Sequence, residues 1–277
     1  MEKAKPFIKW AGGKSQLMPE IAGRFPPKNE ISRYFEPFLG GAAVFFHSGH
    51  PRSFLSDTNR DLVELYQVVQ RDVQGLIEAL RPHRNQREYY YQVRSQNPAE
   101  LSPVQRAARL IFLNKTCFNG LYRVNRKGQF NVPFGRYKNP TICDAAGLRA
   151  ASAVLQSASI SMRDFESVLG DVQPGDFIYF DPPYHPINST SSFTSYTAGK
   201  FDEEEQRRLA AVYAQLARQG CFVMLSNSDT PLIRGLYRDF HIHEIQANRA
   251  INSKPERRGK ITELLIVNYN STTHPES

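Results

Sequence analysis

Residues 33–57 read RYFEPFLGGAAVFFHSGHPRSFLSD, and this stretch decides the fold. A short apolar segment leads into a glycine turn at Gly40 and Gly41, an apolar helix start follows at Val44, and a second apolar segment ends in Asp57. Strand, glycine turn, helix and a strand with a terminal acid form the layout of a Rossmann-like nucleotide site. The stretch therefore predicts an α/β domain with a ligand at its strand ends.

The α/β alternation continues beyond residue 150. The expected strands are the apolar runs at 159–162, 177–180, 221–225, 240–245 and 261–269. A helix is expected over 201–219, with Asp202 as its cap and Glu205 completing a capping box. Between the two α/β parts, apolar spacing predicts helices at 61–80, 88–96 and 104–115, the last capped by Ser102. We therefore predict a discontinuous α/β domain, 1–58 and 146–270, an inserted mainly helical domain, 59–145, and a flexible tail, 271–277.

Composition excludes several classes of protein. The chain has 277 residues, enough for one large domain or two modest ones, with 35 Lys and Arg against 27 Asp and Glu, a formal net charge of +8. That balance suits a polyanionic partner, nucleic acid first and an anionic membrane surface second. No apolar run approaches the ~20 residues that span a bilayer, and the N-terminus lacks a signal-peptide core. Cys117, Cys143 and Cys221 are too scattered for a disulfide framework or a zinc site, so we expect a cytoplasmic protein without metal.

A basic stretch within residues 117–140 carries the clearest local nucleic-acid signal. This part of the chain is expected to form a loop or hairpin, because Gly, Asn and Pro alternate with Phe and Tyr. From 115 to 138 there is no Asp or Glu, and the cations are Lys115, Arg123, Arg126, Lys127, Arg136 and Lys138. Cations interleaved with aromatics are typical of nucleic-acid binding. The alternative is a solvated hairpin tip.

The tetrapeptide Asp181-Pro182-Pro183-Tyr184 follows the apolar run 177–180. Two prolines force a rigid, extended turn, which brings the Asp181 carboxylate and the Pro182 carbonyl close together. Two acceptors beside the Tyr184 ring suit a planar base that carries an exocyclic amine. Taken alone, the tetrapeptide also fits an ordinary turn at a strand end, but the glycine turn and Asp57 favour a ligand site.

A series of short motifs in one order makes the chain resemble a known family. The motifs are Phe7–Lys14, Glu36–Gly41, Leu55–Asn59, Phe118–Arg123, Phe130–Tyr137, Asp181–Tyr184, Phe193–Tyr196, Leu225–Asp229 and Glu263–Leu265. Over roughly residues 5–269 the chain closely resembles the Dam-type DNA adenine-N6 methyltransferases. The resemblance implies a Rossmann-like S-adenosylmethionine-dependent methyltransferase sheet with an inserted target-recognition domain.

The resemblance implies S-adenosylmethionine as the cofactor. The positions that it assigns to cofactor binding are Trp10, Lys14, Phe38, Gly40, Gly41, Asp57, Asp164, Phe165 and Asp181. Chemically, Asp57 suits the ribose hydroxyls and Lys14 the methionyl carboxylate. The alternatives are a core position for Trp10, a helix cap for Asp57 and a solvated charge for Lys14. Relatives often carry a glycine where this chain has Ala42. We expect Ala42 either to keep a negative φ or to bear a mild energetic cost, and Gly41 to take up the turn.

The implied reaction is direct methyl transfer to N6 of an adenine in double-stranded DNA. Asp181 and the Pro182 carbonyl accept both N–H bonds of the amine, and Tyr184 stacks on the ring. An amine inside a duplex cannot reach the cofactor, so the base must flip out. Neither a cysteine nucleophile nor a metal is required.

The resemblance places target recognition in the basic hairpin and implies the target GATC. Arg123 suits the two acceptors of guanine, and Leu121 suits a thymine methyl group. The other DNA-contacting positions implied are Lys9, Tyr137, the inserting Phe118 and Asn119, and the phosphate contacts Asn125, Asn131 and Arg136. We also expect a monomer that acts in the cytoplasm on the nucleoid.

Two alternatives remain open. The first is a methyltransferase of the same fold with another target, such as another adenine site, cytosine N4, RNA or a glutamine side chain. A serine at the first position of the tetrapeptide is commoner for cytosine N4, and an asparagine for glutamine, so Asp181 favours adenine. The second is a catalytically silent DNA-binding relative, which loss of Asp181, Tyr184 or the glycine turn would favour. All three are present.

Overall fold

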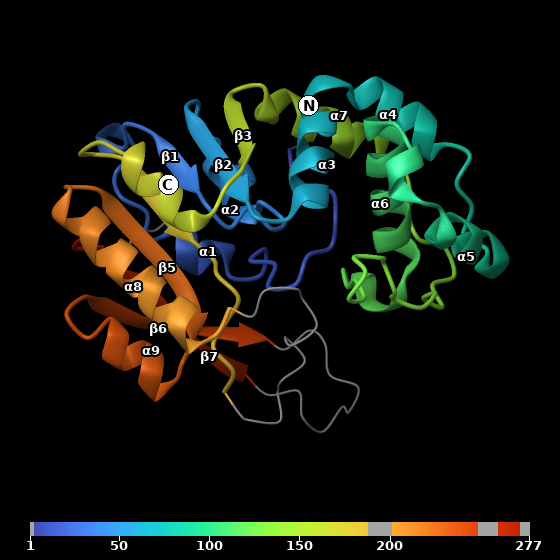
Figure 1. Cartoon of the computed structure of the whole chain (residues 1–277). Helices are drawn as coiled ribbons and strands as arrows, with labels where there is room; N and C mark the ends of the chain where they lie inside the picture. The colour runs from blue at the N-terminus through green and yellow to red at the C-terminus, as the bar shows by residue number, and fades with distance from the viewer. Residues whose placement is uncertain (1–2, 188–200, 249–259, 272–277) are drawn as a thin grey trace.

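The computed structural model describes residues 3–187, 201–248 and 260–271, and its centre is one mixed seven-stranded sheet (Figure 1). The strands are β1 (Tyr34–Glu36), β2 (Ser53–Asp57), β3 (Ala158–Met162), β4 (Phe177–Phe180), β5 (Phe222–Ser228), β6 (His241–Asn248) and β7 (Lys260–Val267). They lie in the order β3-β2-β1-β4-β5-β7-β6. All neighbours run parallel except β7, which is antiparallel to β5 and β6. The predicted α/β class is confirmed.

The strand order reverses between β1 and β4, which are hydrogen-bonded neighbours. In open α/β sheets, ligands bind at such a switch point, outside the carboxyl ends of the strands. The glycine turn follows β1, and the tetrapeptide 181–184 follows β4. The fold therefore brings the two stretches singled out by the sequence to the same edge of the sheet.

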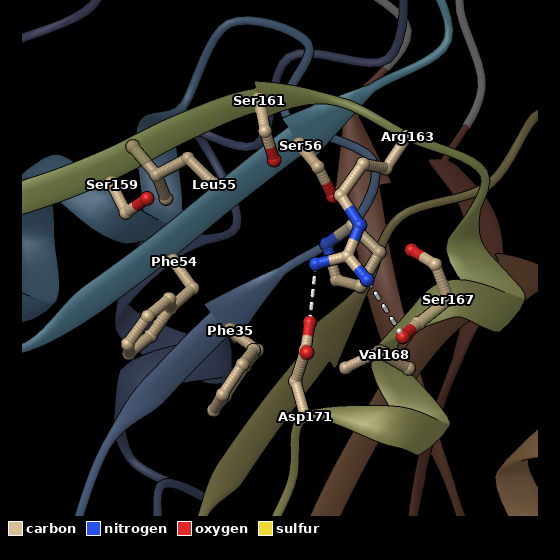
Figure 2. A pocket seen from close by; sticks show the side chains of 11 residues that line it. Phe35, Phe54, Leu55, Ser56, Ser159, Ser161, Arg163, Ser167, Val168 and Asp171 are labelled. Carbon is tan, nitrogen blue, oxygen red and sulfur yellow. Dashed lines mark hydrogen bonds and ion pairs between the residues drawn. The ribbon is translucent and has the colours of Figure 1, made fainter.

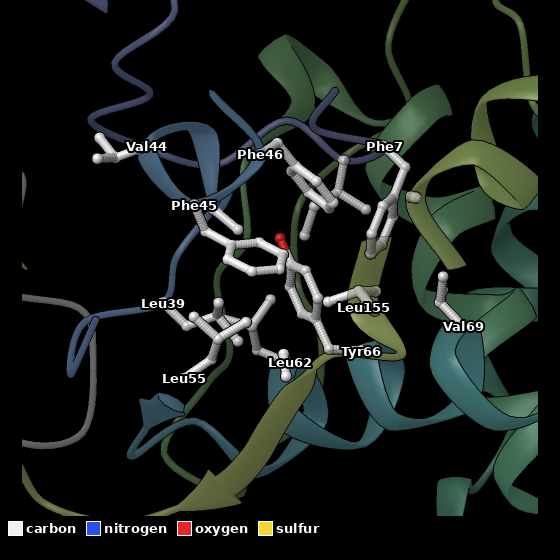
Figure 3. Close-up of a cluster of buried hydrophobic side chains, with 14 of the residues drawn as sticks. Phe7, Leu39, Val44, Phe45, Phe46, Leu55, Leu62, Tyr66, Val69 and Leu155 are labelled. Atoms are coloured by element: carbon white, nitrogen blue, oxygen red, sulfur yellow. The ribbon is translucent and has the colours of Figure 1, made fainter. Parts of the chain in front are cut away.

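Two hydrophobic clusters cover the two faces of the sheet because side chains alternate along each strand. In β1, Tyr34 packs into the first cluster and Phe35 into the second. The first cluster packs the sheet against α1 (Met18–Ala22), α2 (Ala43–Ser48), α3 (Arg60–Arg71) and α7 (Ala145–Leu155); Figure 3 shows its centre around Phe45 and Tyr66. The second packs the sheet against η4 (Phe165–Gly170), α8 (Glu203–Arg218) and α9 (Pro231–Leu236).

The inserted segment is helical, but its first helix is broken. The helix expected over 61–80 is two helices, α3 and α4 (Val73–Leu80), so the prediction of one helix is wrong. Asp72 leaves the helical region at φ −145°, ψ 58°, and its carboxylate accepts from the backbone N–H of Gly75 at 2.9 Å. Apolar spacing runs through the break because both helices bury their apolar faces in the same core. A local cap therefore ends one helix and starts the next.

The remaining predicted helices begin within two residues of their predicted starts. They are α5 (Arg87–Ser95) and α6 (Pro103–Thr116), with short 3₁₀ turns η1 (Lys28–Glu30), η2 (Pro98–Glu100) and η3 (Phe118–Gly120). Ser102 caps α6 in a reciprocal capping box with Gln105. Asp202 caps α8, but the Glu205 carboxylate pairs with Arg208 instead of returning to the cap. The expected capping box at α8 is therefore only half formed.

In Figure 1, α4, α5 and α6 lie together on the opposite side of the molecule from α8 and α9. The first cluster continues from the sheet through α3 into α4 and α6, so one core joins the sheet to most of the inserted helices. A smaller cluster around Tyr90 and Phe112 supports the segment after α6. That segment is the predicted hairpin, with antiparallel bridges Cys117–Phe134 and Val124–Phe130. Within the described ranges, no helix is long and apolar enough to cross a bilayer.

Candidate active site

The turn after β1 has a geometry that differs from the one expected. Gly40 takes φ +47° and Ala42 takes φ +53°, whereas Gly41 does not adopt a positive φ. The expectation that Gly41 would take up the turn is therefore wrong. Ala42 is the N-cap of α2, and its N–H donates to the Leu39 carbonyl at 2.7 Å, which holds it in the left-handed region. For a residue other than glycine this conformation costs ~1–2 kcal/mol, so the surrounding packing enforces the turn.

Trp10 covers the glycine turn. A Cβ at Gly40 would lie 3.1 Å from the Trp10 ring, and the φ of +47° is one that residues with a Cβ rarely adopt, so both features favour glycine there. Trp10 is half-buried and packs against the first cluster, so the core interpretation holds in part. Its ring also stacks on Tyr122 of the hairpin, with centroids 5.2 Å apart.

Asp57, at the carboxyl end of β2, is oriented by two backbone donors. Its carboxylate accepts from the N–H of Asn59 at 2.8 Å and from the N–H of Gly40 at 3.3 Å. Burial raises the pKa of this carboxyl, and the two backbone hydrogen bonds partly offset that rise. The helix cap of α3 is Asn59, whose side chain accepts from Leu62, so Asp57 is not itself the cap. Each carboxylate oxygen has acceptor capacity left for a further hydrogen bond, such as one from a hydroxyl group.

The loop after β4 is held from three sides. The Asn227 side chain accepts from the N–H of His185 at 3.1 Å, and the Ser228 hydroxyl donates to the His185 carbonyl at 2.5 Å. Gln206 of α8 donates to the Pro183 carbonyl at 2.9 Å. Among the described residues, none donates to the carbonyl of Pro182. The loop therefore presents that carbonyl as an acceptor that no described residue engages.

Asp181 forms an ion pair that sequence reasoning missed. The Lys14 Nζ lies 2.7 Å from Oδ1 of Asp181, and the Lys14 side chain is only 4% exposed. The ammonium also donates to the Gly12 carbonyl at 2.5 Å and lies 4.7 Å from the centroid of the Tyr184 ring. Burial raises the pKa of Asp181, and Lys14 opposes that rise. Lys14 is therefore a buried counter-ion, not the solvated charge of the alternative interpretation.

Tyr184 is fixed at its far end. Its hydroxyl donates to Oε2 of Glu263 on β7 at 2.7 Å. Burial and the nearby carboxylates of Asp181 and Glu263 raise the pKa of Tyr184 well above its usual value. The ring therefore stands beside Asp181 with its hydroxyl protonated and its orientation set by the sheet.

A second missed residue is Glu36, which lies at the end of β1 and is 2% exposed. The Tyr34 hydroxyl donates to its Oε2 at 2.7 Å. Burial raises the pKa of Glu36 to about 8, with Asp181 adding to the rise and Lys14 opposing it. Two sequence signals pointed to it, an acid inside the apolar segment 33–38 and its place at the start of the motif Glu36–Gly41, but neither gave it a role in the site. The site therefore contains a buried carboxyl whose raised pKa favours its neutral form at pH 7.

Glu36→Gln is expected to change how stability depends on pH. Because the pKa of Glu36 is raised in the folded protein, the folded state holds a proton between pH 5 and 8 that the unfolded chain releases. Wild-type stability should therefore fall as pH rises through this window, relative to the glutamine variant, by on the order of 1 kcal/mol per pH unit. Denaturant unfolding from pH 5 to 8 measures it, with the exposed Glu78→Gln as control. Parallel curves for wild type and Glu36→Gln would contradict the assignment.

Asp164 and Phe165 lie after β3, at the same edge of the sheet. The Asp164 carboxylate pairs with Arg208 through two contacts of 2.9 Å. Phe165 stacks on Phe38, with centroids 5.4 Å apart and planes 25° apart. These aromatic rings offer an apolar flank next to the glycine turn, whereas the Asp164 carboxylate is already engaged by α8.

The N-terminal segment docks on the base of the hairpin. Asn114 accepts from the N–H of Lys9 at 2.8 Å and donates to the carbonyls of Lys9 and Gly120. The Lys9 ammonium lies 4.6 Å from the centroid of the Tyr137 ring. The structure thus brings together Lys9 and Tyr137, which sequence reasoning had grouped from distant parts of the chain.

Within the hairpin, two predicted DNA-contacting residues bind each other. The Arg123 Nε donates to the Asn131 side chain at 2.7 Å, and an Nη donates to its carbonyl at 3.2 Å. Asn125 organises the turn by accepting from the N–H groups of Lys127 and Gln129. Arg136 is exposed.

Two apolar side chains of the basic hairpin, Phe118 and Leu121, are exposed to solvent. Phe118 is 52% exposed and Leu121 is 39% exposed. Between them, Asn119 holds a left-handed conformation at φ +56°. Exposed large apolar residues rimmed by polar groups mark an interaction site, and apolar wedges that enter a base stack are one such use.

A separate surface hollow lies over β1, β2 and β3, on the face of the sheet that carries the second hydrophobic cluster (Figure 2). Phe35 and Phe54 stack there with centroids 4.7 Å apart, and Arg163 pairs with Asp171 at its rim. None of the residues that the sequence predicts as catalytic or cofactor-binding lines it. Within the described ranges, no group of acidic, His and Cys side chains is arranged to hold a metal ion.

The fold and this site together define an S-adenosylmethionine-dependent methyltransferase. The chemistry of the residues fits that cofactor, because a glycine turn tightly packed under Trp10, an oriented acid after β2, an aromatic flank and a buried ammonium meet at the switch point. The chain belongs to the D12 class N6 adenine-specific DNA methyltransferases, whose family profile matches residues 10–251. It therefore transfers a methyl group from S-adenosylmethionine to N6 of adenine in DNA.

Individual relatives agree with this family. The chain is 46% identical to the Type II methyltransferase M1.LlaDCHI of Lactococcus lactis subsp. cremoris, over 96% of this chain and 95% of the relative. It is also 46% identical to the Type II methyltransferase M.MjaIII of Methanocaldococcus jannaschii, over 96% of this chain and 100% of the relative. It is 36% identical to the DNA adenine methylase of Escherichia coli K12, over 96% of each chain.

Proposed function

We propose that the protein methylates the adenine of GATC in double-stranded DNA, and that Asp181, Pro182 and Tyr184 are its catalytic residues. The observation that carries this proposal is the loop after β4. There, a carboxylate with a buried counter-ion is followed by the Pro182 carbonyl, to which no described residue donates, and both lie next to the glycine turn. The oligomeric state is proposed to be a monomer, acting in the cytoplasm on the nucleoid.

The cofactor pocket is proposed to lie over the turn between β1 and α2. Asp57 holds the ribose, Lys14 attracts the carboxylate of the methionyl group, and Gly40 and Gly41 allow close approach of the backbone. The remaining residues proposed to line the pocket are Trp10, Phe38, Asp164, Phe165 and Asp181. When bound, S-adenosylmethionine supplies a methyl group activated by its sulfonium.

Catalysis is proposed to rest on the orientation of the amine. The lone pair of adenine N6 is delocalised into the ring, which makes the nitrogen a poor nucleophile. If Asp181 and the Pro182 carbonyl each accept one N–H, the nitrogen is drawn toward tetrahedral geometry and its lone pair is released. Lys14 opposes the rise of the Asp181 pKa that burial causes, and so favours the ionised carboxylate, and Tyr184, anchored by Glu263, stacks on the base. Positioning and electrostatics then supply most of the rate gain.

The inserted segment 59–145 is proposed to recognise the target. Phe118 and Asn119 enter the space left by the flipped base, and exposure of the Phe118 ring supports this role. Arg123 and Leu121 read base edges, together with Lys9 and Tyr137. Asn125, Asn131 and Arg136 are proposed to contact phosphates, which also fits the positive net charge.

The experiment that tests the function maps the methylated base. The protein is incubated with labelled S-adenosylmethionine and duplexes that contain GATC or the same site with one base pair changed. After digestion to nucleosides, we expect N6-methyladenine from the GATC duplex and much less from the changed ones. Equal labelling of every duplex, or methyl on another adenine site, would contradict the GATC assignment. Methyl on cytosine N4 would contradict the proposed use of Asp181.

A further inference from the structure

Tyr122 lies where the recognition hairpin (residues 117–137) meets the cofactor end of the sheet. Its ring stacks on Trp10 with planes 30° apart and packs edge-on against Phe130, with centroids 6.0 Å apart. Its hydroxyl donates to Oδ2 of Asp61 at 2.8 Å. Burial and the Asp61 carboxylate raise the pKa of Tyr122, so the hydroxyl stays protonated and donates. One side chain therefore contacts three segments of the molecule.

Each of the two contacts outside the hairpin leads to a residue of the cofactor pocket. Trp10 itself lies against the glycine turn at Gly40. Asp61 is in the first turn of α3, whose cap Asn59 is bonded through its backbone N–H to Asp57. The Tyr122 ring is thus connected to the glycine turn through Trp10, and its hydroxyl is connected to Asp57 through Asp61 and Asn59.

On the other side, Tyr122 is flanked by the residues proposed to read DNA. Leu121 is exposed, and the Arg123 guanidinium is bonded to Asn131 across the hairpin. Tyr122 is half-buried and faces Trp10 of the N-terminal segment and Asp61 at the start of α3. The backbone segment that carries Leu121 and Arg123 is therefore docked by the side chain between them.

We propose that Tyr122 is a positioning residue that couples cofactor binding to DNA recognition. This inference rests on the proposed function of the hairpin and of the cofactor pocket. A cofactor that contacts Trp10 and Asp57 restricts the motion of both anchors of Tyr122. It restricts Trp10 directly, and it restricts Asp61 through Asp57 and the helix cap Asn59. The hairpin then loses part of its conformational entropy when the cofactor binds, so less is lost when DNA binds. Because such coupling is reciprocal, each ligand tightens the binding of the other.

The test measures DNA affinity with and without S-adenosylhomocysteine, which binds like the cofactor but carries no methyl group to transfer. Binding of a fluorescent GATC duplex is followed by anisotropy. For the wild type we expect saturating S-adenosylhomocysteine to lower the Kd for DNA about five- to tenfold. In Tyr122→Leu the two Kd values should become equal within about twofold. Tyr122→Phe keeps the stacked ring but loses the bond to Asp61, so its ratio should lie between the two.

Tyr91→Leu is the matched control, because this half-buried tyrosine contacts only Tyr90 and Arg94 among the aromatic and cation–π pairs of the described residues. It should keep the wild-type ratio. Thermal unfolding checks that each variant is folded, and Tyr122→Phe decides the matter if Tyr122→Leu is not. A wild-type ratio of one, or a Tyr122→Phe ratio equal to that of wild type, overturns the proposal. A protein that binds neither S-adenosylhomocysteine nor DNA would instead overturn the proposed function.

Discussion

Replacing Asp181 by asparagine is expected to lower kcat for methyl transfer about 10²- to 10³-fold, the range for loss of one preorganised electrostatic contact. The carboxylate accepts from the amine more strongly than a neutral amide does, because charge-assisted hydrogen bonds are about twice as strong. Duplex binding should change little, since Asp181 lies on the loop after β4 and not in the recognition hairpin. Steady-state kinetics at saturating cofactor, together with anisotropy for DNA binding, measure both effects.

Asparagine is preferred to alanine because of Lys14. Removing the whole carboxyl leaves a buried ammonium that keeps its hydrogen bond to the Gly12 carbonyl and its contact with the Tyr184 ring but has lost its counter-ion. Breaking one side of a buried ion pair costs ~3–5 kcal/mol. Asparagine also removes the charge but keeps an amide oxygen that can accept from the ammonium, whereas alanine removes the acceptor as well and would lose more stability. Asp171→Asn is the matched control, since Asp171 pairs with Arg163 at the hollow on the opposite face. Turnover close to wild type in Asp181→Asn would contradict the mechanism.

Arg123→Ala is expected to relax target specificity at guanine about tenfold to a hundredfold. A guanidinium matches the two acceptors on the guanine edge, and losing such a contact costs ~1–3 kcal/mol of discrimination. To make it, Arg123 must exchange at least part of its hydrogen bonding to Asn131 for the base. The measured quantity is the ratio of kcat/KM on GATC to kcat/KM on a duplex changed at the guanine.

Arg136→Ala supplies the comparison from the same hairpin. Arg136 is exposed and is proposed to contact phosphate, so its loss should lower kcat/KM on all duplexes by a similar factor. The discrimination ratio should then stay at its wild-type value. If Arg123→Ala behaves in the same way, Arg123 is a backbone contact and the recognition scheme is wrong.

Much of the architecture was predictable from local pattern. Apolar runs that end in Asp57 and Asp181, with glycines after one strand and prolines after another, are properties of neighbouring residues. These runs predicted the α/β class and the ligand edge of the sheet, and the alternation of Gly, Asn and Pro with aromatics and cations over 117–140 predicted the basic hairpin. Both predictions succeed because backbone preferences and burial periodicity act over a few residues. The grouping of Lys9 with Tyr137 came from the family resemblance.

Local pattern failed where a single residue changed the backbone. Asp72 divides the helix expected over 61–80, since its carboxylate caps a new helix while the apolar spacing continues through it. Ala42 adopts the left-handed conformation that glycine was expected to supply, because the close packing of the turn under Trp10 and its bond to Leu39 enforce it.

The sequence by itself determined which elements form and which residue types stand at their ends. Only the tertiary structure decided which of those residues meet: Lys14 with Asp181, Tyr184 with Glu263, and Tyr122 with Trp10 and Asp61. It also decided that Glu36 is buried and protonated at neutral pH. The physical reason is that secondary structure follows from interactions between neighbours in the chain. Ion pairs, ring stacks and pKa values instead depend on distances that the strand order and the packing of the core impose.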